Sequence, residues 1–157
     1  MKVFIFLLAI FGIFAIASGN VALRSTAIKG TLNCGANPAE NVHVRLLRVF
    51  VDPKAKEENV AKEVLDSRIT GPSGQFEVNG NTNGRALNET NIEPSIAIYH
   101  QCDDAKDTKG FRRFLIKVPE KFVTVGRNPK KTYDIGDLNL QITYPGEIRD
   151  KNFKPAN

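Results

Sequence analysis

Short runs in which apolar and polar residues alternate with a period of two make up most of this chain. Such alternation is typical of strands with one buried face, because successive side chains of a strand point to opposite sides of the sheet. The runs are separated by clusters of Gly, Pro, Asn and Asp, which favour turns. Together these features predict an antiparallel all-β domain.

Each run predicts the apolar residues of one strand. In chain order these residues are Ile28, Leu32 and Cys34; Val42, Val44 and Leu46; Leu65 and Ile69; Phe76 and Val78; Ile96, Ile98, His100 and Cys102; Phe114, Ile116 and Val118; and Leu138, Leu140, Ile142 and Tyr144. Residues 70–74 are predicted to form a hairpin turn, and residues 79–91 a long polar loop. Residues 55–62 could form a short helix or a loop, of which we expect the loop.

The start of the chain is typical of a secretory signal peptide. Lys2 supplies a positive charge, and an apolar run from Val3 to Ala17 follows it. That run is shorter than the roughly 20 apolar residues of a membrane-spanning helix, and small residues of the kind that signal peptidase accepts follow it. We therefore expect cleavage after Ala17 or Gly19, a signal peptide over residues 1–19, and a secreted extracellular protein without a transmembrane segment. The alternative is an uncleaved anchor.

Two cysteines, Cys34 and Cys102, remain after the expected cleavage. In an oxidising compartment two cysteines allow a single connectivity, and both fall on inward strand faces, as a bridge between strands requires. The bridge would close a loop of about 70 residues, which the chain-entropy model values at about 4 kcal/mol. The two are too far apart for a Cys-x-x-Cys redox motif, so we expect a structural disulfide.

The charge of the chain is modestly positive. The formal net charge is +5, and removal of Lys2 with the signal peptide leaves 5 − 1 = +4. Because this surplus forms no stripe of basic residues, the sequence argues against nucleic-acid binding. Cations do gather in one part of the sequence, where an anionic lipid headgroup or an acidic receptor would suit them; the alternative is ordinary charge that faces water. The expected binding residues are Lys121, Arg127, Lys130 and Lys131, with Arg112, Arg113 and Lys117 upstream.

Three further residues are candidates for a site. His43 and His100 are the two histidines, and no Cys, His or carboxylate at metal-ligand spacing accompanies them. We therefore expect structural histidines and no metal, cofactor or catalytic residue. Asn88 begins the sequon Asn88-Glu89-Thr90, where a glycan could be attached in the predicted loop.

Several motifs resemble those of the nematode transthyretin-like proteins, a family of small secreted domains. They are Cys34-Gly35-Ala36-Asn37-Pro38, Gly71-Pro72-Ser73-Gly74-Gln75-Phe76, Ile98-Tyr99-His100-Gln101-Cys102, the run of residues 129–140 and Tyr144-Pro145-Gly146-Glu147-Ile148-Arg149-Asp150. The resemblance covers residues 24–150, nearly the whole mature chain. It implies a transthyretin-like β-sandwich of about seven to eight strands over residues 20–150.

The resemblance also implies a function. Members look like secreted binding proteins, and at least one links phosphatidylserine on dying cells to an engulfment receptor. An extracellular recognition role is therefore expected, and the alternative is a transthyretin-type carrier of a small apolar ligand. The related 5-hydroxyisourate hydrolases end in Tyr-Arg-Gly-Ser, whereas this chain ends Lys154-Pro155-Ala156-Asn157, so we expect no enzyme. The commoner second cysteine pair of the family is absent, which predicts a loose tail over residues 151–157.

Overall fold

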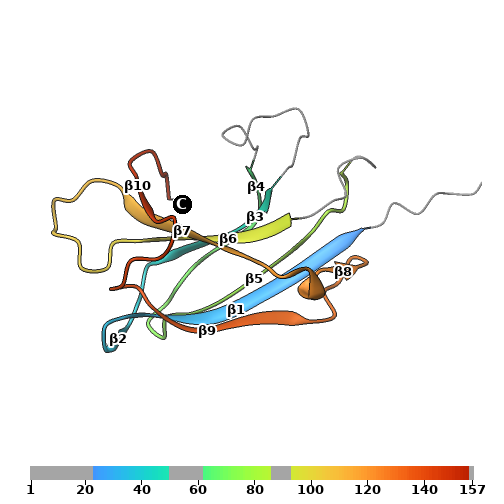
Figure 1. Ribbon diagram of the computed structural model, residues 1–157, viewed down its shortest axis with the longest axis horizontal. Coiled ribbons are helices and arrows are strands. Elements are labelled where there is room, and N and C mark those ends of the chain that lie inside the picture. The colour runs from blue at the N-terminus through green and yellow to red at the C-terminus, as the bar shows by residue number, and fades with distance from the viewer. Residues whose placement is uncertain (1–22, 50–61, 86–92, 156–157) are drawn as a thin grey trace, which may run out of the picture.

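The computed structural model describes residues 23–49, 62–85 and 93–155, which form strands and a short 3-10 helix, η3 (Figure 1). The expected signal peptide, most of the uncertain 55–62 segment and the Asn88 sequon lie outside the described residues. The elements are β1 (Arg24–Cys34), β2 (Asn37–Pro38), β3 (His43–Val49), β4 (Lys62–Ile69), β5 (Gln75–Asn81), β6 (Glu93–His100), β7 (Phe111–Lys117), η3 (Glu120–Phe122), β8 (Thr124–Val125), β9 (Thr132–Asn139) and β10 (Ile148–Asp150).

The strands form two sheets, which Figure 1 shows as two layers. In the first sheet β1 is central, antiparallel to β5 and parallel to β9, while the short strands β2 and β8 pair with its two ends. The second sheet has the order β10-β7-β6-β3-β4, and its pairs are all antiparallel. The expected β-sandwich is confirmed. The strands that the sequence did not reveal, β2, β8 and β10, are two or three residues long, too short for alternation to be recognised.

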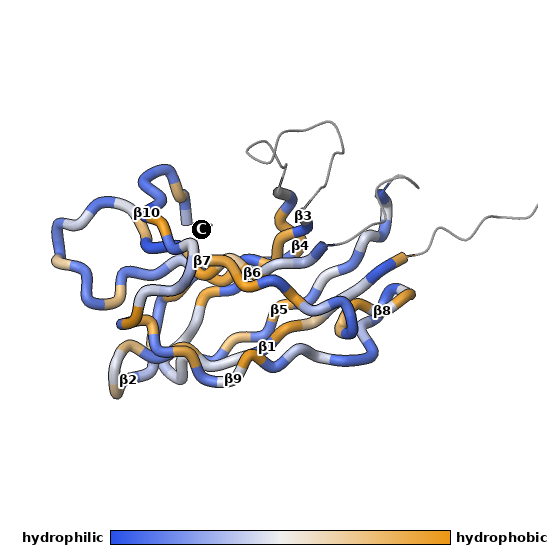
Figure 2. The backbone as a smooth tube through the Cα atoms, in the orientation of Figure 1, coloured by the Kyte–Doolittle hydropathy of each residue, from blue (hydrophilic) through white to orange (hydrophobic). Residues whose placement is uncertain are grey.

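The core lies between the two sheets, as the alternation predicts. Figure 2 shows apolar residues along β1 and β5 in one layer and along β6 and β7 in the other. Full burial of one such side chain is worth roughly 1.5–3 kcal/mol. The fully buried members are Ile28, Leu32, Val44, Leu46, Val78, Ile96, Ile98 and Leu140, with Phe114 at 1% exposure.

A disulfide joins the two sheets at one end of this core. Cys34 closes β1 of the first sheet, and Cys102 lies just beyond β6 of the second. The two are bonded, with Cα atoms 5.7 Å apart, which confirms the expected bridge.

The connection between β4 and β5 corrects the expected hairpin. β4 pairs with β3 in the second sheet, whereas β5 pairs with β1 in the first, so residues 70–74 carry the chain from one sheet to the other. Thr70 fixes the crossing point, because its Oγ1 accepts a bond from Val42 N at 2.9 Å and donates to Ala39 O at 2.7 Å. Turn-forming residues specify a change of direction but not the partner of the next strand, which explains the error.

Two strand boundaries also differ from expectation. β5 continues to Asn81 through residues assigned to a loop, because its backbone keeps pairing with β1 as far as Ser25. The closing strand β9 runs over 132–139, earlier than the alternation from Leu138 to Tyr144 suggested. Beyond it Ile142 is 56% exposed, while Tyr144 returns to stack on Phe114 with ring centroids 4.1 Å apart.

The described part of the C-terminal tail, expected to be loose, is held at Phe153 and Lys154, while the side chains around them are exposed. Phe153 stacks on Tyr99, with ring centroids 3.9 Å apart, and Arg45 donates a bond to the carbonyl of Lys154. A single aromatic ring can anchor a short tail without a second disulfide, so the missing cysteine pair does not leave Phe153 free.

Candidate functional site: a basic tip

The segment between β7 and β9 forms one end of the sandwich, where η3 and β8 lie (Figure 1). β8 is tied to the start of β1 by the pairs Ser25–Thr124 and Arg24–Val125. Just beyond it, Gly126 N donates to Leu23 O at 2.6 Å. Because β1 is the central strand of its sheet, this pairing gives the segment a firm base.

Side-chain hydrogen bonds fix the rest of the segment. Thr26 Oγ1 donates to Phe122 O at 3.2 Å, and Lys130 N donates to Thr124 Oγ1 at 3.1 Å. Asn81 Nδ2, from the end of β5, donates to the carbonyl of Arg127 at 3.3 Å. The backbone is therefore held from both β1 and β5, while the long side chains of the segment are left to extend outward.

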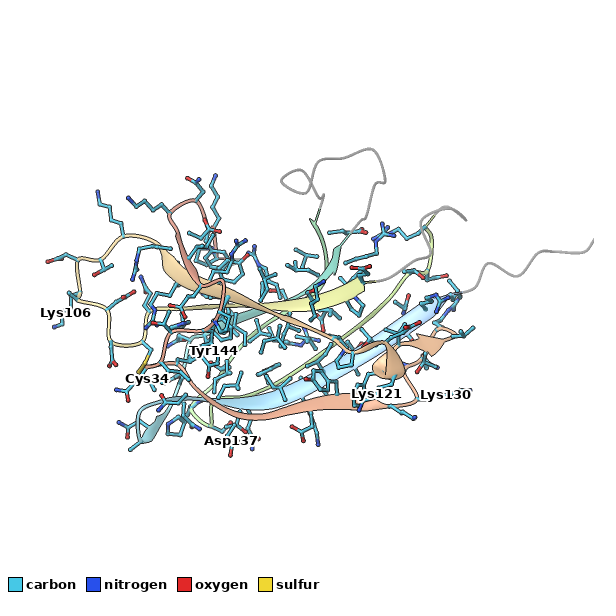
Figure 3. The ribbon with its side chains drawn as sticks, viewed as in Figure 1. Cys34, Lys106, Lys121, Lys130, Asp137 and Tyr144 are labelled. Atoms are coloured by element: carbon cyan, nitrogen blue, oxygen red, sulfur yellow. A yellow bond between two sulfur atoms is a disulfide. The ribbon has the colours of Figure 1, made fainter. Side chains whose placement is uncertain are left out.

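The four cations predicted as binding residues all belong to this end of the molecule. We call Lys121, Arg127, Lys130 and Lys131 the basic tip; all four are exposed. Figure 3 shows Lys121 and Lys130 beside η3 and β9, at the end away from Cys34.

The charges of the basic tip have few partners among the residues that the structure describes. No carboxylate of the described residues forms an ion pair with any of the four. Arg127 Nη2 lies 3.4 Å from Asn83 Oδ1, and Lys121 Nζ lies 5.3 Å from the ring centroid of Phe122. Glu120, which is exposed, is the acidic neighbour in the sequence. The four positive charges are therefore available to an external anion.

The upstream arginine Arg112 does not join the tip. Its Nε donates to Glu147 Oε1 at 2.5 Å, and its guanidinium also reaches the carbonyls of Leu140 and Ile142. Arg112 is the second residue of β7, at the disulfide end, whereas Lys117 is the last residue of that strand. Nearness in sequence was misleading here because an extended strand separates its two ends by about 3.3 Å per residue.

Sequence reasoning missed an apolar side chain at the tip. Val125 is 63% exposed, the highest value among the large apolar residues described. It lies between Lys121 and Lys130 in sequence and precedes Gly126, whose φ is +123°. No pattern marked it, because a valine beside a threonine is typical of any strand.

The two histidines are part of the packing. His100 is 1% exposed; its Nδ1 accepts a bond from Cys102 N at 3.4 Å, and its ring meets the edge of Phe114. Burial, with a smaller contribution from Arg112, lowers the pKa of His100 to about 4. The pKa of His43 is also lowered, chiefly by burial. Both side chains are therefore neutral at physiological pH.

One cluster has metal-ligand spacing without suitable ligands. Cys34, Cys102 and Asp103 place donor atoms within 4.8 Å of one another. The two sulfur atoms are bonded to each other, so neither is the thiolate that a metal ion would need.

A depression of about 590 Å³ lies on the outer face of the first sheet. Polar and charged side chains from β1, β5 and β9 line it, and Lys29 pairs with Asp134 across it at 3.4 Å. Pockets for apolar ligands are lined mainly by hydrophobic side chains, so this depression does not favour the carrier alternative.

The fold and these features define a small β-sandwich protein with a disulfide between its sheets and a positively charged end. The sequence model of the protein family described as the Transthyretin-like family matches residues 29–119 of this chain. The chain belongs to this family, and the resemblance in its motifs is confirmed.

Curated relatives from Caenorhabditis elegans agree. Transthyretin-like protein 46 is 36% identical over 95% of this chain and 75% of its own length. Transthyretin-like protein 33 is 34% identical over 90% of this chain and 92% of its own length. Transthyretin-like protein 2 is 35% identical over 80% of this chain and 81% of its own length. These relatives are named as transthyretin-like proteins rather than as enzymes.

A solved 9R-lipoxygenase from Cyanothece covers 74% of this chain and 16% of its own, with a TM-score of 0.39 and 14% identity, too little to establish a shared fold. In the part of the chain that the structure describes, no helix has the length and apolar character needed to cross a bilayer.

Proposed function

We propose that this protein is a secreted extracellular recognition protein and that its basic tip docks on an anionic surface, either a lipid headgroup layer or an acidic receptor. The observation that supports this most is the set of four exposed cations that pair with no carboxylate of the described residues, on a segment anchored to β1 and β5. A rigid base lets the cations meet a surface together, so that little ordering cost is added on binding.

The attraction would be mainly Coulombic. A cation near a charged membrane gains about 1 kcal/mol, and this gain declines with salt because the Debye length is about 8 Å at physiological ionic strength. Loss of two lysines from the tip should therefore cost about 2 kcal/mol, or roughly 30-fold in affinity.

Liposome sedimentation tests the lipid form of the proposal. The native protein should sediment with vesicles that contain phosphatidylserine but not with phosphatidylcholine alone, and salt should weaken the binding. The double variant Lys130→Gln and Lys131→Gln should bind roughly 30-fold more weakly.

The matched control is Lys106→Gln with Lys109→Gln, which removes the same charge from the loop before β7. Figure 3 shows Lys106 at the end of the molecule away from the basic tip. The control should bind like the native protein. Equal weakening of both double variants would mean that net charge, not the tip, drives the attraction.

The receptor form has its own test. It applies if the protein fails to bind vesicles even at low salt. In that case, retention on immobilised poly-glutamate that is weakened by the Lys130 and Lys131 variant, but not by the control variant, would support an acidic protein partner. Failure of both assays would overturn the proposal.

A further inference from the structure

The outer face of the second sheet carries an apolar cluster that is separate from the core. Leu47, Ala97 and Tyr99 are buried there, at 4%, 0% and 6% exposure, with Phe111 and Leu115 packed against them. The outward residues of a sandwich strand are usually polar, because that face meets water. An apolar outer face therefore needs a cover, and at one end that cover is Phe153 of the C-terminal tail.

Three rings surround the ring of Phe153. It stacks on Tyr99 with centroids 3.9 Å apart and planes 20° from parallel. It meets Phe111 at 4.9 Å and His43 at 5.2 Å in edge-to-face contacts. Stacked and edge-to-face geometries are the ones that aromatic pairs prefer, so they stabilise the contact beyond the area that they bury.

Arg45 contacts both the ring of Phe153 and the backbone that follows it. Its guanidinium carbon lies 4.4 Å from the ring centroid of Phe153, a cation–π contact. Its Nη2 also donates a 2.7 Å hydrogen bond to the carbonyl of Lys154. We call His43, Arg45, Tyr99 and Phe111 the Phe153 site; together they fit an aromatic side chain followed by a free backbone carbonyl.

The tail has little other attachment among the described residues. β10 ends at Asp150, and the side chains of Lys151, Asn152, Lys154 and Pro155 are exposed. Besides the contacts of Phe153 and the Lys154 carbonyl, Asn152 N donates to Asp150 Oδ1, a bond within the tail itself. The tail thus behaves as a short ligand that is covalently attached to its own site.

We propose that the Phe153 site is a docking site for an aromatic residue in a segment of a partner protein, and that the chain's own tail closes it. A short tether gives Phe153 a local concentration in the millimolar range, so a free segment competes poorly until the tail is displaced. The site shares no residue with the basic tip, so this proposal is independent of the proposed function.

A peptide added in trans tests the proposal. The probe is a fluorescein-labelled peptide of residues 150–155, Asp-Lys-Asn-Phe-Lys-Pro, with an amidated C-terminus, and binding is followed by anisotropy. The full-length Phe153→Ala variant should bind it at least about tenfold more tightly than the native protein, whose own tail competes. The same peptide with Ala in place of Phe should not bind.

Second variants assign the contact. Adding Arg45→Gln to Phe153→Ala should abolish binding, since both the cation–π contact and the carbonyl bond are lost. Adding Arg68→Gln instead should leave it intact, because Arg68 is exposed on β4 and pairs with Asp66.

The proposal is overturned if a folded Phe153→Ala variant, checked by its circular dichroism and cooperative unfolding, fails to bind the peptide. If that variant does not fold, Phe153→Leu keeps most of the bulk, and its failure to bind would count equally. Concentration-dependent dimers of the native protein that Phe153→Ala abolishes would also contradict the proposal, because the occupant would then be a second copy.

Discussion

At the residue scale, His100 is held neutral by its surroundings. It is 1% exposed, and Nε2 has no hydrogen-bond partner among the described residues. The charged groups that influence it are Arg112, Glu147, Asp104 and Arg149, of which the first and last oppose protonation. The folded-state pKa of about 4 lies below the ordinary value of 6.5, so the unfolded chain binds a proton more readily between these two values.

The sign of the effect on stability follows. Neutral His100 makes its full contribution to the free energy of unfolding above about pH 6.5. This contribution is lost as the pH falls towards about 4, and the loss is at most about 3 kcal/mol. Lowered pKa values at Asp104 and Glu147 add loss in the same direction, over a more acidic range. The free energy of unfolding, measured with urea at pH 7.5 and at pH 5, should differ less between the two pH values for His100→Asn than for the native protein. Equal differences would show that His100 does not cause the acid sensitivity.

At the element scale, β8 combines firm pairing with an exposed apolar side chain. Its two residues pair with β1, yet Val125 points to solvent among the cations of the basic tip. Apolar side chains flanked by Lys and Arg are typical of segments that enter the headgroup region of a membrane. If the lipid form of the proposed function holds, Val125 should be the residue that enters first.

The chain contains no tryptophan, so a single Val125→Trp substitution supplies a unique fluorophore. Its emission should shift to the blue when phosphatidylserine vesicles are added, because the indole leaves water. Ile148→Trp is the matched control, since Ile148 is 50% exposed on β10 at the other end of the molecule. A shift for Ile148→Trp without one for Val125→Trp would mean that the other end faces the membrane.

At the scale of the whole molecule, the disulfide and the basic tip lie at opposite ends of the sandwich. The bridge joins the last residue of β1 to the residue that follows Gln101, across a sequence separation of 68. It therefore restricts the unfolded chain over nearly half of its length and ties the two sheets together at the end where β1 and β9 stop pairing.

Replacement of both Cys34 and Cys102 by Ala should lower the free energy of unfolding by about 4 kcal/mol, a large part of the roughly 5–15 kcal/mol of a typical domain. Denaturant unfolding of the native and variant proteins measures this difference. Vesicle binding at a temperature where the variant is folded should not change, because the basic tip is anchored to β1 and β5 at the other end. A loss of binding by the folded variant would show that the tip depends on the bridge.

Most residues of the basic tip could be predicted from the clustering of cations in the sequence, but which nearby cations lie outside the tip could not. Lys121, Arg127, Lys130 and Lys131 were recognised as a cluster because they follow one another in a short stretch of sequence. Arg112 was grouped with them wrongly, since its partner Glu147 is distant in sequence and only the pairing of β7 with β10 brings the two together. The packing of Phe153 could not be predicted from the sequence either, because the rings that contact it come from three strands that are distant in the chain.

The sequence by itself determined the class of fold, the inward faces of the main strands and the disulfide, because these depend on alternation within a strand and on two cysteines with one possible pairing. The tertiary structure decided which strands are neighbours: β5 with β1 rather than β4, and β9 parallel to β1. It also decided that Val125 is exposed and that Phe153 packs against the second sheet. Local patterns report the period of a strand and the direction of a turn, whereas pairing and burial depend on contacts between residues far apart in the chain.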